Sequence, residues 1–240
     1  MNCPYTLTYS PMGDRALLIQ WPSRIDTAII EDIWRLRSAL ADPIIVDYIV
    51  AYHSLTLVFS SEQKDFSPWI HWVQERYADT SNLEKTEVPN KEIVLPVYYN
   101  AEVAPDLERY LEHKKMSLSE MICLHTQQRY TLFFYGFQPG FMYLGGLEAK
   151  LVHPRKERPS AQVRSGSVAI GGAQTGIYPH TAPGGWHVIG HCPLVLFDPN
   201  LSNPCVAMPG DVIRFRSIEQ PEYHRILEFS RPKKNELSGD

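Results

Sequence analysis

The pattern of hydrophobic and polar residues predicts a small α+β unit at the start of the chain. Alternating or β-branched runs that are typical of strands occupy residues 5–9, 15–20, 44–50 and 54–59. Asp26 is a candidate helix N-cap because apolar residues follow it at helical spacing, and Pro43 ends that helix. Ser67, followed by proline, begins a second helix. The order β-β-α-β-β-α favours an antiparallel sheet with helices on one face.

Three tryptophans lie within the predicted helices, namely Trp34, Trp69 and Trp72. An aromatic set of this kind could stack on a ligand. At helical spacing such side chains are far more often core residues, so we expect all three to belong to the core.

A polar segment without periodicity follows this unit. Residues 78–91 read ADTSNLEKTEVPNK, a composition typical of a domain boundary. We therefore predict an N-terminal α+β domain over residues 1–88 and a second domain over residues 89–230. The residues after Arg231 are expected to be frayed.

Short strand-like runs dominate the second domain. Residues 93–98 read as a strand, and Pro96 favours an edge position for it. A short helix is expected at residues 106–113, and a capping box at residues 117–120 begins another that runs to about His125. Further strand-like runs, most of them separated by glycine or proline, occupy residues 132–135, 168–170, 186–189, 194–197 and 212–215. Several short strands of this kind predict a β-barrel or a sandwich.

Glycine is concentrated in one stretch of this domain. Residues 136–190 contain 11 of the 14 glycines, with prolines and aromatic residues among them. Glycine permits positive φ and close backbone approach, whereas proline fixes φ. Together they specify well-defined loops, which are frequent sites of binding and catalysis. The alternative is that these residues only serve the tight turns of a barrel.

Composition excludes several classes of function. The chain has 240 residues, of which 44% are apolar and 21% charged, as in an ordinary soluble globular protein. Its net charge of −4 offers no basic patch for nucleic acid, and no run approaches the ~18 apolar residues of a membrane span. The cysteines are scattered and the N-terminus does not resemble a secretory signal, so we expect reduced thiols in a cytoplasmic protein.

Common catalytic and metal motifs are absent from the sequence. It contains no P-loop, no Gly-x-Ser-x-Gly elbow and no His-Glu-x-x-His. We therefore assign no catalytic residue and predict no metal site.

Two glycine–aromatic segments suggest a pocket instead. Residues 136–141 and 183–186 each combine glycines, which have no side chain, with large aromatic residues. This composition is common in ligand sites. Arg155 could bind a carboxylate or phosphate through two hydrogen bonds, although a solvated surface arginine is the simpler interpretation. His187 and His191 are more often structural than catalytic. The candidate pocket residues are Gly136, Phe137, Pro139, Gly140, Phe141, Arg155, Gln174, Tyr178, Gly184, Gly185, Trp186 and His191.

Long ordered motifs connect the chain to a known family. They are GDRALL, HSLTLVF, GFQPGF, YLGGL, Pro154-Arg155, GSVAIGGAQTGIYP, PGGWHVIGH, LFDP and PGD, and they span nearly the whole chain up to about Phe215. With these motifs the chain strongly resembles the family that contains the 5-oxoprolinase B subunit, the kinase inhibitor KipI and allophanate hydrolase subunit 1.

The resemblance implies both a fold and an activity. The expected fold is an N-terminal α+β domain followed by a cyclophilin-like β-barrel. The implied reaction is the ATP-dependent opening of 5-oxo-L-proline to L-glutamate, with ATP bound by the complex. The implied partners are two further subunits, a homologous one designated C and a lactam hydrolase designated A, and the chain alone is expected to be inactive. Alternatives are a KipI-like inhibitor of a sensor histidine kinase and subunit 1 of allophanate hydrolase.

The chain departs from the family pattern at two places. Family members usually have a second proline–arginine pair where this chain has Pro159 and Ser160, and a Val-Pro-Ala-Gly-Ser turn where it has residues 163–167. Losing an arginine weakens a two-arginine anion clamp. Arg158 and Arg164 are the candidates to replace it.

Overall fold

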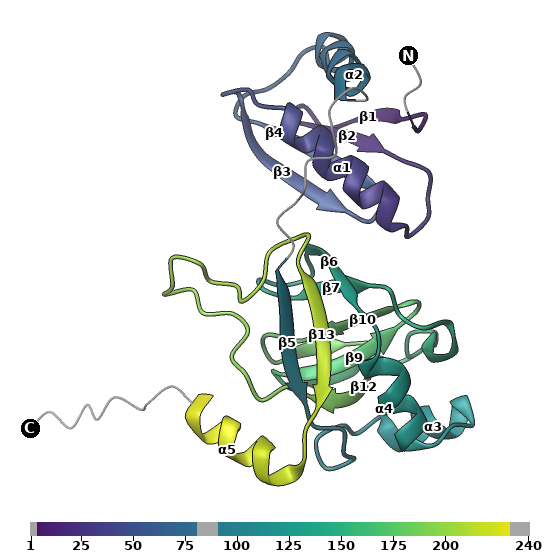
Figure 1. The fold of residues 1–240 in the computed structure, drawn as a ribbon. Helices are drawn as coiled ribbons and strands as arrows, with labels where there is room; N and C mark the ends of the chain where they lie inside the picture. The colour runs from purple at the N-terminus through teal and green to yellow at the C-terminus, as the bar shows by residue number, and fades with distance from the viewer. Residues whose placement is uncertain (1–3, 81–90, 231–240) are drawn as a thin grey trace, which may run out of the picture. The chain divides into compact units, whose positions relative to one another are not determined.

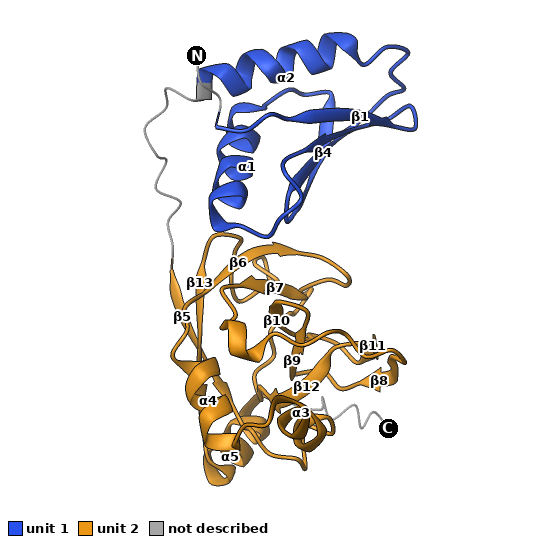
Figure 2. Cartoon of the chain, turned by 90° about the vertical axis from the view of Figure 1, so that its right-hand side faces the viewer, with its two compact units in different colours: residues 1–89 blue, residues 90–240 orange. Residues whose placement is uncertain are grey.

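The chain divides into two compact units, residues 1–89 and residues 90–240 (Figure 2). The structure, a computed structural model, describes residues 4–80 and 91–230. Most of the predicted boundary segment and the tail from Arg231 therefore lie outside the described residues, as does Cys3. The other three cysteines, Cys123, Cys192 and Cys205, are free thiols.

The first unit is a four-stranded antiparallel sheet with two helices, as predicted. Its strands follow the order β1-β2-β4-β3, and its elements are β1 (Thr8–Met12), β2 (Ala16–Gln20), α1 (Thr27–Ala39), β3 (Ile45–Ala51), β4 (Ser54–Phe59) and α2 (Ser67–Thr80). Alternate residues of β2 and β4 are buried, which gives the sheet one core face. The first strand begins three residues later than predicted. The turn at Gly13 (φ 64°) pairs Met12 with Ala16, and pairing continues from there back to Thr8, which lies opposite Gln20.

The helix starts of this unit are set by aspartates. The Asp26 carboxylate accepts a hydrogen bond from the Ala28 N–H at 3.0 Å, which confirms the predicted N-cap. Helix α2 begins at Ser67 itself, and the Asp65 carboxylate accepts a hydrogen bond from the Ser67 N–H.

The prediction that three tryptophans are core residues is wrong. Trp34, Trp69 and Trp72 are only half-buried. The Trp69 indole N–H donates to Gln63 near the surface, so its ring cannot sink fully into the core. The buried indole of this unit is Trp21, 4% exposed, whose N–H donates to Asp32 at 2.7 Å.

The second unit contains a seven-stranded sheet that nearly closes on itself. The strand order is β12-β9-β10-β7-β6-β13-β5, antiparallel except for the β13–β5 pair (Figure 1). The strands are β5 (Glu92–Val97), β6 (Tyr130–Tyr135), β7 (Met142–Gly145), β9 (Ser167–Gly171), β10 (Gln174–Ile177), β12 (His187–His191) and β13 (Val212–Ser217). Tyr98 and His191 exchange backbone hydrogen bonds at 2.9 and 3.0 Å and so join the two edges. The sheet is therefore barrel-like, and Pro96 lies in an edge strand as predicted.

Three helices and a short second sheet accompany this barrel. The elements are α3 (Leu107–Lys114), α4 (Leu118–Thr126), η1 (Ala149–Leu151), α5 (Gln220–Ser230) and the pair β8 (Ser160–Val163) and β11 (Ala182–Gly184). The Ser117 hydroxyl accepts a hydrogen bond from the Glu120 N–H, which confirms the cap of α4. The predicted strand at residues 194–197 is wrong, because prolines at 193 and 199 bound a loop in which Phe197 makes one isolated bridge to Cys205.

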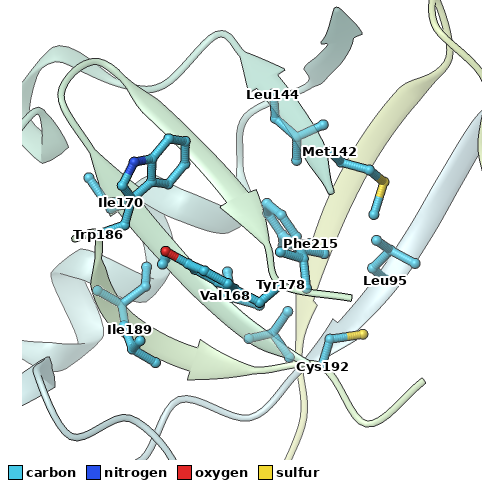
Figure 3. Packing of buried hydrophobic residues seen from close by; sticks show 14 of the residues in the cluster. Leu95, Met142, Leu144, Val168, Ile170, Tyr178, Trp186, Ile189, Cys192 and Phe215 are labelled. Atoms are coloured by element: carbon cyan, nitrogen blue, oxygen red, sulfur yellow. The ribbon is translucent and has the colours of Figure 1, made fainter. Parts of the chain in front are cut away.

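Side chains from β5, β7, β9, β12 and β13 pack together inside the barrel (Figure 3). His125 belongs to this interior: its ring bonds to the Tyr99 hydroxyl at 2.7 Å and to Thr175 at 3.1 Å. Burial lowers the pKa of His125 to about 3, so the ring is neutral. Among the described residues, no helix is long and apolar enough to cross a membrane.

Candidate functional site

Glycines leave one face of strands β7, β9 and β10 almost bare. Gly176 pairs with Ala169 and with Tyr143, and Gln174 pairs with Gly171, so these residues point to the same side of the sheet. A Cβ atom at Gly171 would lie 2.5 Å from the Trp186 ring, and one at Gly176 would lie 2.8 Å from the Met142 carbonyl oxygen. The glycines are required because aromatic rings lie directly on the sheet backbone.

Five aromatic rings form a cluster on this face: Phe137, Phe141, Tyr143, Tyr178 and Trp186. Phe141 lies at the centre, with ring centroids 4.9 Å from Tyr143, 5.2 Å from Tyr178 and 5.5 Å from both Trp186 and Phe137, all edge to face. Figure 3 shows Tyr178 and Trp186 among the buried residues of this unit. We call these five residues the aromatic cluster.

The hydroxyl groups of the aromatic cluster stay protonated at neutral pH. Burial raises the pKa of Tyr178, and the backbone N–H of Trp186 bonds to the Tyr178 hydroxyl and partly opposes this. Burial also raises the pKa of Tyr143, against the positive charge of Arg155. Both phenols therefore keep their protons at the edge of an apolar surface.

Arg155 adds a positive charge to the aromatic cluster. Its guanidinium carbon lies 5.7 Å from the Trp186 ring centroid, and the side chain is exposed. Among the residues described, no carboxylate forms an ion pair with it. This contact is compatible with the simpler interpretation of Arg155 as a solvated surface residue, and it also leaves the guanidinium open to an anion beside Trp186.

Gln174 contributes a buried acceptor on the same face of the sheet. The side chain is only 7% exposed, and Oε1 has no hydrogen-bond partner in the described part of the chain. An unpaired buried carbonyl is costly, and native proteins nearly always satisfy such groups. A ligand N–H donor would complete its hydrogen bonding.

A half-buried ion pair fixes the segment that carries Arg155. The Lys156 ammonium donates to Asp106 Oδ2 and to Ser160 Oγ, both at 2.8 Å. The same carboxylate oxygen accepts the Val188 N–H of β12 at 2.9 Å, and the Lys156 N–H donates to the Gly185 carbonyl at 2.7 Å. These bonds hold the residue that follows Arg155 against β12 and the turn before it.

The two departures from the family pattern do not rebuild an anion clamp. Ser160 accepts the bond from Lys156, whose charge Asp106 already neutralises. Arg164 lies beside His191 and Tyr223 instead, where it bonds to the Tyr223 hydroxyl and lowers the pKa of His191.

His191 has a structural role. Its Nε2 bonds to the Ser165 carbonyl at 2.8 Å and its Nδ1 to the Tyr223 hydroxyl at 3.2 Å. Burial, with Arg164 nearby, lowers the pKa of His191 to about 4. Nothing in the described structure links its ring to the aromatic cluster, so His191 joins β12 to α5.

The turn from Gly136 to Phe141 supports the cluster with its backbone. The Gly136 N–H donates to the Phe141 carbonyl at 3.3 Å, and the Phe141 N–H donates to the Gln138 carbonyl at 3.0 Å. Gly140 (φ 80°) packs on the Phe197 side chain, where a Cβ would lie at 2.6 Å. Pro139 is exposed on this turn, and Gly184 leaves room for the Tyr178 hydroxyl.

Sequence reasoning missed three residues of this site: Tyr143, Asp106 and Lys156. Tyr143 lies in the YLGGL motif, but only the strand register shows that it faces Gly176. Asp106 is 82 positions from its partner Val188, so no local pattern connects them. In the part of the chain that the structure describes, no three His, Cys, Asp or Glu side chains are arranged to hold a metal ion.

Known proteins share both the sequence and the fold. Residues 7–207 match the family described as carboxyltransferase domain, subdomain C and D. Two relatives are B subunits of 5-oxoprolinase. The Bacillus subtilis subunit is 32% identical over 91% of this chain and 96% of its own length. The Escherichia coli subunit is 36% identical over 85% of this chain and 93% of its own length. The Kluyveromyces lactis urea carboxylase shares the fold, with a TM-score of 0.75 at 17% identity over 96% of this chain and 23% of that enzyme. The chain belongs to the family of 5-oxoprolinase B subunits, with carboxyltransferase subdomains C and D.

Proposed function

We propose that the chain is the B subunit of an ATP-dependent 5-oxoprolinase, a complex of several different chains that hydrolyses 5-oxo-L-proline to L-glutamate. Relatives of that name align with 85–91% of the chain. The single observation in the structure that carries the proposal is the unpaired Arg155 guanidinium over Trp186. The complex would act in the cytoplasm, where ATP is available.

The aromatic cluster matches the chemistry of this substrate. 5-Oxo-L-proline has a nearly flat lactam ring, one carboxylate and one ring N–H. We assign the ring to the apolar faces of the cluster, the carboxylate to Arg155, and the N–H to Gln174 Oε1, which has no partner in the described structure.

The same residues fit ATP poorly. A triphosphate carries several negative charges, whereas the aromatic cluster is contacted by Arg155 and the neighbouring Lys156 is already paired with Asp106. We therefore assign the phosphates of ATP to another surface of the complex. Phosphorylation of the lactam oxygen would supply a leaving group that water can displace, and this chain would bind and orient the ring.

Partner chains are part of the proposal. Arg155 and Phe137 are exposed, so one side of the site is open, and a second chain would cover it. By resemblance these chains are the homologous one designated C and the lactam hydrolase designated A. The alternatives, inhibition of a sensor histidine kinase and allophanate hydrolysis, share the fold, but no contact in the site favours them.

The proposal is tested by co-expressing the chain with its two partner chains. Glutamate release from 5-oxoproline is measured with and without ATP, with allophanate as the competing substrate. We expect ATP-dependent release from the full complex and none from the chain alone. An assembled complex that acts on allophanate, or on neither compound, would contradict the proposal.

A further inference from the structure

Phe137 has an unusual backbone conformation for a bulky residue. Its φ is 62°, and the N–H of Gln138 donates to the Gly136 carbonyl at 2.7 Å. This is a γ-turn with positive φ at the central residue, the rare and strained form of that turn. Strain of this kind persists only where the surroundings enforce it, and it concentrates at binding sites.

The other non-glycine residue with positive φ in the described chain has an ordinary explanation. Lys115 (φ 50°) ends helix α3, where its N–H and that of Met116 bond to the carbonyls of the last helical turn. Phe137 ends no helix. Glycine would fit its φ without strain, so the aromatic side chain itself needs a reason.

The turn holds the Phe137 ring at the rim of the aromatic cluster. The ring is 60% exposed, yet its edge contacts reach Phe141 at 5.5 Å and Tyr178 at 6.2 Å between centroids. The turn is closed by bonds that do not involve this side chain, including Gln138 Nε2 to the His180 carbonyl at 3.3 Å. Removing the ring should therefore leave the turn in place.

We propose that Phe137 is a ligand-contacting residue whose exposed ring covers a flat, carboxylate-bearing lactam held by Arg155. This inference rests on the proposed function and gives one residue of the aromatic cluster a specific role in that site. Because the strained turn fixes the ring before binding, little conformational freedom is lost when the ligand enters. Phe141 and Tyr178 contact the inner edge of the Phe137 ring directly, so the exposed part of that ring is the surface offered to the ligand.

Stability separates this role from a structural one. In the isolated chain, Phe137→Ala is expected to shift the thermal midpoint by no more than about 4 °C, because most of the ring is already exposed. Phe137→Gly should melt at or above Phe137→Ala, the reverse of the usual order, because glycine relieves the positive φ. A midpoint that falls by about 10 °C or more in both variants would overturn the proposal in favour of a packing role.

Binding is measured on the assembled complex with 5-oxo-L-proline as the probe. Phe137→Ala and Phe137→Gly should raise the dissociation constant about ten-fold or more, and Phe137→Tyr should retain it. Phe229→Ala, which removes a more exposed aromatic ring on α5, should leave it unchanged. If the wild-type complex does not bind 5-oxoproline, the proposed function fails and this inference fails with it. If the wild type binds and Phe137→Ala binds equally well, the inference alone is wrong. Loss of assembly in Phe137→Ala would show that the ring contacts a partner chain instead.

Discussion

Arg155 is the residue on which recognition of an anion depends. A charge-assisted hydrogen bond to a carboxylate contributes about 1.5–3 kcal/mol, so Arg155→Ala should raise the KM for 5-oxoproline about 10- to 100-fold. Because the side chain is exposed, the thermal midpoint of the chain should change little.

The first unit provides a matched control for this arginine. Arg76 lies 5.9 Å from the Trp72 ring centroid, so it has the same kind of contact with an indole. Arg76→Ala should leave KM unchanged when measured beside Arg155→Ala. Equal effects of the two substitutions would mean that the loss is not specific to the aromatic cluster.

The Gln174 side chain is predicted to lower the stability of the ligand-free protein. Its Oε1 is buried without a partner, and such a group costs about 1–3 kcal/mol. Gln174→Met keeps the shape without the carbonyl, so it should raise the thermal midpoint by about 2–4 °C while weakening 5-oxoproline binding.

Gln138→Met is the control for Gln174→Met. The Gln138 side-chain amide donates to the His180 carbonyl, so Gln138→Met should not raise the midpoint. A midpoint that drops in Gln174→Met would show that the amide is satisfied in solution, and the assignment of a ligand N–H to it would be abandoned.

At the level of elements, the close contact between Trp186 and β9 depends on Gly171. A methyl group there would lie 2.5 Å from the ring, and overpacking of this kind costs about 1–3 kcal/mol. Gly171→Ala should therefore lower the free energy of unfolding, measured with urea, and reduce binding by displacing the ring under Arg155.

Gly185→Ala is the matched substitution in the same stretch. The nearest atom to a Cβ at Gly185 is 3.8 Å away, which is ordinary contact. We expect almost no change in the free energy of unfolding. If both alanines destabilise the chain equally, backbone freedom rather than ring contact explains the glycines.

The two units differ in how much of them the sequence could predict. In the first, β2 and β4 each have one buried face, so alternation marks these two strands clearly. In the second, every residue of β9, β10 and β12 is buried, so alternation disappears, and β10 contains a glycine. Helix α5 was missed although Tyr223, Ile226 and Leu227 follow a helical stripe.

Prediction of the site depended on what each residue contacts. Phe141, Gln174, Tyr178 and Trp186 are candidates because they lie in glycine-rich motifs, and Arg155 is a candidate because its guanidinium can bind an anion. His191 lies in the same motifs but bonds to Ser165 and Tyr223, and only the fold shows that its ring is directed elsewhere. Residue type identifies candidates, whereas the strand register decides which of them meet.

At the scale of the whole molecule, two buried histidines make stability depend on pH. Burial lowers the pKa of His125 to about 3 and that of His191 to about 4, from an ordinary value of 6.5. The unfolded chain binds these protons below pH 6.5 while the folded chain does not. Stability is therefore complete above pH 6.5 and falls as the pH is lowered, by about 1.4 kcal/mol per pH unit for each histidine near pH 5.

Urea unfolding at several pH values measures this slope. His125→Leu should reduce it by about one proton, whereas His224→Gln, which changes an exposed ring of α5, should not. In NMR spectra of the wild type, the His125 ring should not titrate between pH 7 and pH 5. Titration of that ring near pH 6.5 would contradict its buried, neutral state.

The parallel pairing of β5 with β13 also orders events during synthesis. β5 is the first strand of the second unit and β13 is its last, and an isolated backbone bridge between Tyr98 and His191 connects the end of β5 to β12. The ribosome must therefore have released the chain through β13 before the barrel can close. The elements of the first unit are complete by residue 80 and can fold long before that. A chain that stops short of Val212 would leave β5 and β6 with unpaired edges, and such fragments should aggregate and need a chaperone rather than fold into a smaller barrel.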